Sequence, residues 1–354
     1  MKRFQIVLSA VLLFVTAAWA AAQAPSTIPT TVRKIALGGD GGWDYLTADS
    51  AAKRLYVSRG DRVIVVDTES EKAVGEVADT RGVHGIAVVP DLGRGFTSNG
   101  GDNSVTAFDL KTLKATGNVK VGRGPDAIMF DPASNRVFTF NHGTKDATAV
   151  DPSGVTVAGT VALDGVPEAA VADGRGHVFV NIMDKNEVVE FDARSLKVVN
   201  RWSIAPGQRP TGLALDLEHR RLFSVCSGSQ TMVVLDAESG HLIAKLPIGR
   251  GADGCSFDPE RGLAFSSNGG DGTVTVVREE ERGRFEVAAT IKTQQGARTM
   301  TLDPKSHRLY LSAATYASTP AAKAETKTAP AKKARGGRGR NIVPGSFVIV
   351  VVGY

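Results

Sequence analysis

Seven aromatic residues recur along the chain at a nearly constant spacing of roughly 40 to 45 residues, each inside the same local pattern. They are Tyr56, Phe96, Phe138, Phe179, Phe223, Phe265 and Tyr310. A repeat of this length, built from short strand-like runs, is typical of a β-propeller. Each repeat forms one blade, which cannot bury both of its faces alone and therefore packs against its neighbours. The spacing thus predicts a circular all-β fold.

Each of the first six repeats contains four strand-like runs rich in β-branched and aromatic residues. The first run ends at a turn residue, and these residues are Asp49, Pro90, Asp131, Asp173, Asp216, Asp258 and Asp303. The second run carries the repeated aromatic residue, the third is Val-rich, as at 63–67, and the fourth is weaker, as at 242–246. We therefore expect an all-β, seven-bladed β-propeller with four-stranded antiparallel blades, formed as one domain by residues 31–354.

The seventh repeat lacks a fourth strand-like run of its own. Its third run is residues 347–352, and a spare strand-like run, residues 31–36, precedes the first blade. Pairing the two runs in one blade would close the ring and would leave no open sheet edge at its join. We therefore predict that the last blade is closed by the N-terminal strand.

The formal net charge of +5 is concentrated in two short segments, and the rest of the chain is mildly acidic. One segment is a basic insert at 317–343, rich in Ala, Lys, Gly and Arg without apolar periodicity, which predicts a disordered loop in the last blade. Its anion-contacting residues would be Lys332, Lys333, Arg335, Arg338 and Arg340. A polyanion contact, a solvated insertion without function, and a loop that covers an acidic site on the same face all remain open.

The N-terminus has the order of a secretory signal peptide. Lys2 and Arg3 precede an apolar run from Ile6 to Val15, and small residues follow it. The run is shorter than the roughly 20 apolar residues that a membrane span needs. We interpret residues 1–22 as a signal peptide and 23–30 as a linker, with an uncleaved anchor as the alternative. The mature chain is expected to be periplasmic or secreted, without a stable membrane span.

The two cysteines, Cys226 and Cys255, fall on adjacent blades. In an oxidising compartment such a pair can form a disulfide. Two buried small residues that never meet are the equal alternative, because a bridge needs Cα atoms within about 7 Å.

The second runs also resemble those of a known family. Segments 54–58 (RLYVS) and 308–312 (RLYLS), each with a Val-rich third run, resemble the YVTN-repeat β-propeller family of YncE-like exported proteins. The resemblance covers residues 31–354 apart from the basic insert, which departs from it. It implies the propeller fold. It also implies a surface-layer, binding or DNA-contacting role, since such roles are suggested for some members of the family. No catalytic motif is carried over.

Equivalent positions near the start of each first strand should converge around the central channel. Five residues before each turn residue lie Asp44, Gly85, Asp126, Glu168, Thr211, Asp253 and Arg298. The sequence therefore predicts an acidic ring at one mouth of the channel, with Trp43 and His84 beside it and His142 within reach. Carboxylates this close repel one another unless a cation, an arginine, a basic ligand or a raised pKa offsets the repulsion.

The predicted ligand-binding residues are Asp44, His84, Asp126, Glu168, Asp253 and Arg298. A divalent cation would take Asp44, Asp126, Glu168 and Asp253 as ligands, since hard cations favour several oxygens. The alternative is that these residues form only the polar lining of a water-filled channel and bind no ligand.

Two classes of function remain open. The first is an exported binding or interaction protein that uses the channel-mouth face for an unknown small molecule or protein. The second is a metal-dependent, lactonase-like hydrolase with a carboxylate site at the same place. The sequence contains no nucleophile motif and no phosphate-binding loop, and it identifies no cofactor beyond a divalent cation. We expect a monomer.

Overall fold

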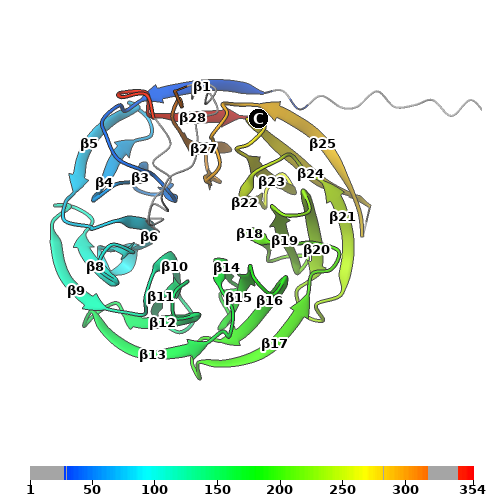
Figure 1. The fold of residues 1–354 in the computed structure, drawn as a ribbon, viewed down its shortest axis with the longest axis horizontal. Helices are drawn as coiled ribbons and strands as arrows, with labels where there is room; N and C mark the ends of the chain where they lie inside the picture. The colour runs from blue at the N-terminus through cyan, green and yellow to red at the C-terminus, as the bar shows by residue number, and fades with distance from the viewer. Residues whose placement is uncertain (1–27, 29, 282, 318–341) are drawn as a thin grey trace, which may run out of the picture.

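The fold is a ring of seven four-stranded antiparallel sheets (Figure 1). The computed structural model describes residues 28, 30–281, 283–317 and 342–354. Within these residues the only helical element is the short 3-10 turn η1 (Pro90–Leu92). The expected seven-bladed β-propeller with four antiparallel strands per blade is thereby confirmed.

In the first six blades the strands follow one another in chain order from the innermost to the outermost. Blade one contains β2 (Leu46–Asp49), β3 (Arg54–Arg59), β4 (Arg62–Asp67) and β5 (Lys72–Val77). Blade two contains β6 (Val83–Val89), β7 (Arg94–Asn99), β8 (Ser104–Asp109) and β9 (Ala115–Lys120). Blade three contains β10 (Pro125–Asp131), β11 (Arg136–Asn141), β12 (Asp146–Asp151) and β13 (Thr156–Ala162).

The next three blades follow the same order. Blade four contains β14 (Pro167–Ala172), β15 (His177–Ile182), β16 (Glu187–Asp192) and β17 (Lys197–Ser203). Blade five contains β18 (Pro210–Asp216), β19 (Arg221–Cys226), β20 (Thr231–Asp236) and β21 (Leu242–Pro247). Blade six contains β22 (Ala252–Asp258), β23 (Leu263–Asn268), β24 (Thr273–Glu281) and β25 (Arg284–Lys292).

The repeated aromatic side chains form the core between adjacent blades. All seven are at most 2% exposed, and one cluster joins Phe138 of blade three to Phe191 of blade four, with ring centroids 5.3 Å apart. Burial of an aromatic side chain removes about 150–250 Å² of surface from water. The seven residues together therefore contribute much of the hydrophobic stabilisation between the blades.

The ring is closed by the two ends of the propeller. The last blade contains β26 (Met300–Asp303), β27 (Arg308–Ala313) and β28 (Val348–Gly353), and β1 (Thr31–Ala36) is its outermost strand. β1 pairs with β28 in an unbroken antiparallel register from Thr31 opposite Gly353 to Ala36 opposite Val348. The predicted closure by residues 31–36 is confirmed.

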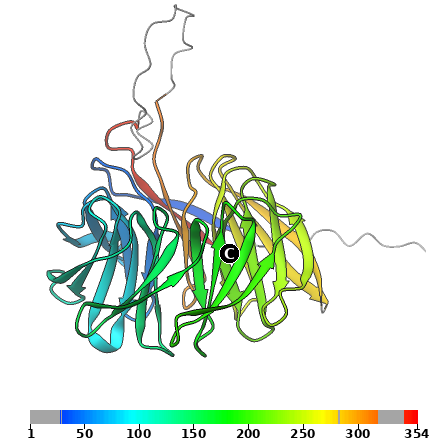
Figure 2. The ribbon, with the colours of Figure 1, turned by 60° about the horizontal axis from the view of Figure 1, so that its bottom comes forward.

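Figure 2 shows the ring of blades turned toward its side. Because every blade is an antiparallel sheet with its first strand innermost, the innermost strands all begin on one face of the ring, which we call the channel-mouth face. In five blades the pairing of the first strand with the second is irregular near this start, for example between Pro125 and Ile128. Such irregularities redirect side chains and are common next to functional sites. Among the described residues, no helix is apolar and long enough to cross a membrane.

Candidate functional site

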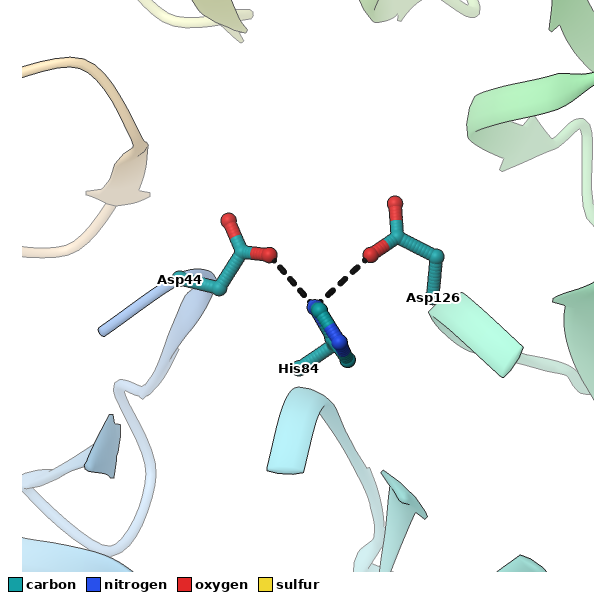
Figure 3. A group of neighbouring side chains, drawn as sticks. All are labelled: Asp44, His84 and Asp126. Atoms are coloured by element: carbon teal, nitrogen blue, oxygen red, sulfur yellow. Dashed lines mark hydrogen bonds and ion pairs between the residues drawn. The ribbon is translucent and has the colours of Figure 1, made fainter. Parts of the chain in front are cut away.

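His84 lies between two carboxylates at the channel mouth. Its Nδ1 atom is 2.7 Å from Oδ2 of Asp44 and 2.9 Å from Oδ1 of Asp126. Figure 3 shows the two carboxylates on opposite sides of the imidazole ring, both aimed at the same nitrogen. The three residues come from the start of three consecutive blades, so the ring of the propeller, and not sequence proximity, brings them together.

Asp126 also contacts a second histidine. Its Oδ2 atom is 3.1 Å from Nε2 of His142, which lies between β11 and β12 of the same blade. The same nitrogen is 3.9 Å from Oε1 of Glu168 at the start of blade four. The Asp126 side chain is 11% exposed and the Glu168 side chain 14% exposed, so both carboxylates are largely removed from water.

Arg298 joins the acidic ring from the last blade. Its guanidinium is paired with Asp253 and donates a hydrogen bond of 2.9 Å to Oδ1 of Asp44. It also contacts the backbone carbonyl of Trp43 at 3.4 Å. These contacts raise the pKa of Arg298 further above its ordinary value although burial acts in the opposite direction. Asp253 is therefore partnered by an arginine and stands outside the two histidine-centred groups.

The carboxylates and histidines shift one another's pKa values. Burial, together with repulsion from Asp126, raises the pKa of Glu168 to about 8. Burial disfavours the imidazolium of His84, but its contacts with Asp126 and Asp44 outweigh burial and raise its pKa to about 10. The same balance, with Asp126 as the main partner, raises the pKa of His142 to about 9.

Serine hydroxyls on the second strands fix the backbone of the site. The Ser58 hydroxyl accepts a hydrogen bond of 2.8 Å from the Asp44 backbone N–H, and the Ser98 and Ser267 hydroxyls accept equivalent bonds from Gly85 and Gly254. This repeated support was not identified in the sequence analysis, although a serine follows the aromatic residue by two positions in several repeats.

A cavity of about 160 Å³ lies in the channel next to the acidic ring. Small residues and backbone form much of its wall, and Tyr45 and Asp253 also line it. Burial and the nearby carboxylates, Asp126 first among them, raise the pKa of the Tyr45 hydroxyl well above its ordinary value. Sequence reasoning missed Tyr45, because nothing in the repeat distinguishes it from an ordinary first-strand residue.

Two groups of side chains present the donor atoms that a metal ion requires. One comprises Asp44, His84 and Asp126, and the other comprises Asp126, His142 and Glu168. In each group the donor atoms lie within 4.8 Å of one another. The Nε2 atom of His142 is buried and makes no hydrogen bond of good geometry, as expected for a nitrogen that binds a metal ion. Imidazole nitrogen with carboxylate oxygen suits zinc, manganese or iron better than calcium.

The other predicted features have separate outcomes. Cys226 and Cys255 are free thiols in the structure, so the disulfide is not formed there, and both side chains are at least partly buried.

The basic residues of the insert lie outside the described residues, and their polyanion contact stays a prediction. They are Lys332, Lys333, Arg335, Arg338 and Arg340. The two described ends of the insert meet on the channel-mouth face, where Tyr316 pairs with Ile342 and its ring lies 6.1 Å from that of Trp43.

Comparisons with known proteins support the fold. No family model and no curated protein sequence matches the chain. A chain of the Kuenenia stuttgartiensis hydrazine synthase superposes with a TM-score of 0.67 at 17% identity, covering 76% of this chain and 92% of that one. A chain from the crystal structure of a mitotic checkpoint complex superposes with a TM-score of 0.70 at 14% identity, covering 87% and 95%. At these identities the likeness concerns the seven-bladed β-propeller fold alone.

Proposed function

We propose that this chain is an exported binding protein that holds a divalent transition-metal cation at its channel mouth. The observation that carries the proposal is the position of His84 Nδ1, 2.7 Å from one Asp44 oxygen and 2.9 Å from one Asp126 oxygen. A single N–H lies in the plane of the imidazole ring and cannot be directed well at two acceptors on opposite sides. Three donor atoms around one point are the arrangement that a bound cation needs.

The charge of the site supports a cationic ligand. Asp44, Asp126, Glu168 and Asp253 bring four carboxylates to one mouth of the channel, and Arg298 pairs with two of them. A bound cation would let both histidines be neutral ligands and would stabilise the ionised form of Glu168. Such an ion would supply a Lewis acid to which a small anionic or carbonyl ligand can bind.

Two features of the sequence support export. Residues 1–22 have the order of a signal peptide, and the repeats resemble those of the exported YVTN-repeat family. We place the mature protein in the periplasm or outside the cell. N-terminal sequencing of the protein recovered from a periplasmic or culture fraction tests this, with a mature terminus close to residue 23 expected. A full-length chain retained in the cytoplasm would contradict it.

Elemental analysis tests the binding proposal. Protein loaded with Zn²⁺ or Mn²⁺ and then desalted should retain stoichiometric metal, and the Asp126→Asn variant should lose it. Asp164→Asn is the matched control, because it neutralises a side chain that is 78% exposed and pairs with Arg201 away from both histidines. Absence of retained metal in the parent protein, with no thermal shift on adding either ion, would refute the proposal.

A second candidate function is metal-dependent hydrolysis of a small ester or lactone. The observation that favours it is the 160 Å³ cavity next to the acidic ring, which has room for a small substrate beside the ligand groups. Turnover of a panel of aliphatic lactones and esters by the metal-loaded protein, abolished in the Asp126→Asn variant, would support it. Metal retention without turnover of any panel member would favour the binding role.

A further inference from the structure

We propose that the channel mouth holds two divalent cations bridged by the carboxylate of Asp126. This inference rests on the proposed metal-binding function and extends it from one ion to a pair. Oδ1 of Asp126 lies 2.9 Å from His84, whereas Oδ2 lies 3.1 Å from His142. The two oxygens of one carboxylate thus face two different imidazole nitrogens, which is the geometry of a bridging ligand in a two-metal site.

The first position is formed by Asp44, His84 and Asp126 (Figure 3). Asp44 uses its two oxygens differently, because Oδ1 accepts a hydrogen bond from Arg298 while Oδ2 faces His84. The arginine thereby fixes the carboxylate and leaves one oxygen for an ion. Outer partners of this kind orient ligands in metal sites, and their loss typically reduces metal affinity about 10–100-fold.

The second position is formed by Asp126, His142 and Glu168. Its donor atoms are less satisfied than those of the first. Nε2 of His142 is buried without a hydrogen bond of good geometry, and the Glu168 carboxylate approaches that nitrogen only to 3.9 Å. Buried polar atoms are rarely left in this state. A cation between Asp126, His142 and Glu168 would satisfy all three.

Three protein donors per position leave further coordination sites for water or a bound ligand. Manganese and zinc accept mixed imidazole and carboxylate donors, and ions in two-metal sites lie about 3.5–4 Å apart. A single bridging carboxylate between two histidines is compatible with such a separation. The ligand class that fits the paired ions is a small oxyanion or a hydrated carbonyl compound, which can contact both metals at once.

Metal titration of chelator-treated protein tests the inference. With Mn²⁺ as the probe, calorimetry should give two equivalents per chain, and electron paramagnetic resonance should show a spin-coupled pair at full loading. The Glu168→Gln variant should bind a single equivalent and show the six-line signal of an isolated ion. This variant preserves the shape of a side chain whose carboxylate lies 3.9 Å from His142, so its fold should be retained, as circular dichroism will check.

The outcomes separate the two proposals. Asp164→Asn should keep both equivalents, whereas Asp126→Asn should weaken binding of each by at least about tenfold. One equivalent in the parent protein, unchanged in Glu168→Gln, would overturn the two-ion inference and leave the proposed function standing. No binding of Mn²⁺ or Zn²⁺ by the parent protein would overturn both.

Discussion

Arg298 donates a hydrogen bond of 2.9 Å to Asp44 although the two residues are 254 positions apart in the sequence. The contact joins the last blade to the first at the channel mouth, on the inner side of the closure that β1 forms with β28 on the outer side. The ring is therefore closed twice, once by backbone hydrogen bonds and once by a charged pair. Arg298 also pairs with Asp253, so one side chain links three blades.

Replacing Arg298 with Met should destabilise the metal-free protein by about 2–3 kcal/mol. The change leaves Asp44 and Asp253 without their cation in a partly buried site, and hydrogen bonds to charged groups have this magnitude. Urea unfolding measures the effect. Arg250→Met is the control, because Arg250 is 70% exposed and its pair with Asp271 should contribute less than about 1 kcal/mol. Equal losses in the two variants would contradict the closing role of Arg298.

Replacing Ile35 with Ala in the N-terminal strand should destabilise the protein by about 2–5 kcal/mol. Ile35 is 5% exposed and packs into the cluster between the last blade and the first. Val32, which is 42% exposed in the same strand, provides the control, and Val32→Ala should have little effect. Thermal unfolding by calorimetry distinguishes the two. A loss at Val32 as large as that at Ile35 would mean that strand pairing, and not this side chain, secures the closure.

The metal-free protein should lose stability as the pH rises. His84 and His142 have folded pKa values of about 10 and 9 against an ordinary 6.5, and Glu168 has one of about 8 against 4.5. A raised folded pKa contributes stability that is complete below the unfolded value and is lost as the pH passes the folded value. The free energy of unfolding should therefore fall between about pH 5 and pH 10.

Urea titrations in the presence of a chelator measure this profile. The double variant His84→Gln, His142→Gln should lose the decline above about pH 8, because only the histidines titrate there. Glu168→Gln should lose the decline below about pH 6.5, and between these two values each variant should show a shallower slope than the parent. A parent profile that is flat or rises from pH 5 to pH 10 would show that these groups are not coupled as the structure has them.

The two cysteines should react slowly with thiol reagents in the folded protein. Burial raises the pKa of Cys226 to about 11, and burial followed by repulsion from Cys226 raises that of Cys255 above its ordinary value, so little thiolate exists at pH 8. Two thiols should titrate rapidly only in denaturant. Peptide mapping without reductant that recovers a bridged pair would contradict the free thiols.

The fold could be predicted from the sequence because each repeat shows the strand pattern of one blade. Seven buried aromatic residues and seven first-strand turns fix the number of blades, and the spare run at 31–36 fixes the closure. The convergence of Asp44, Asp126 and Arg298 followed from counting back along the first strands. The prediction needed only the rule that equivalent positions in a circular array meet around one axis.

The detailed geometry of the site could not be predicted from the spacing of the repeats. Asp126 lies within the irregular pairing between Pro125 and Ile128, and the spacing of the repeats does not show that its two oxygens face two different histidines. Asp253 was expected beside the other carboxylates as a metal ligand, but its pairing with Arg298 places it outside the histidine-centred groups. The roles of His142 and Tyr45 depend on distances across the channel, and sequence spacing does not set those distances.

A crystal structure of the Mn²⁺-soaked protein, with anomalous differences measured at the manganese edge, tests whether the channel mouth holds two ions. Two anomalous peaks are expected there, one on either side of the Asp126 carboxylate, with His84 and His142 each bound to one of them. An ordered channel mouth without an anomalous peak, and with the histidines still contacting the carboxylates directly, would contradict this expectation.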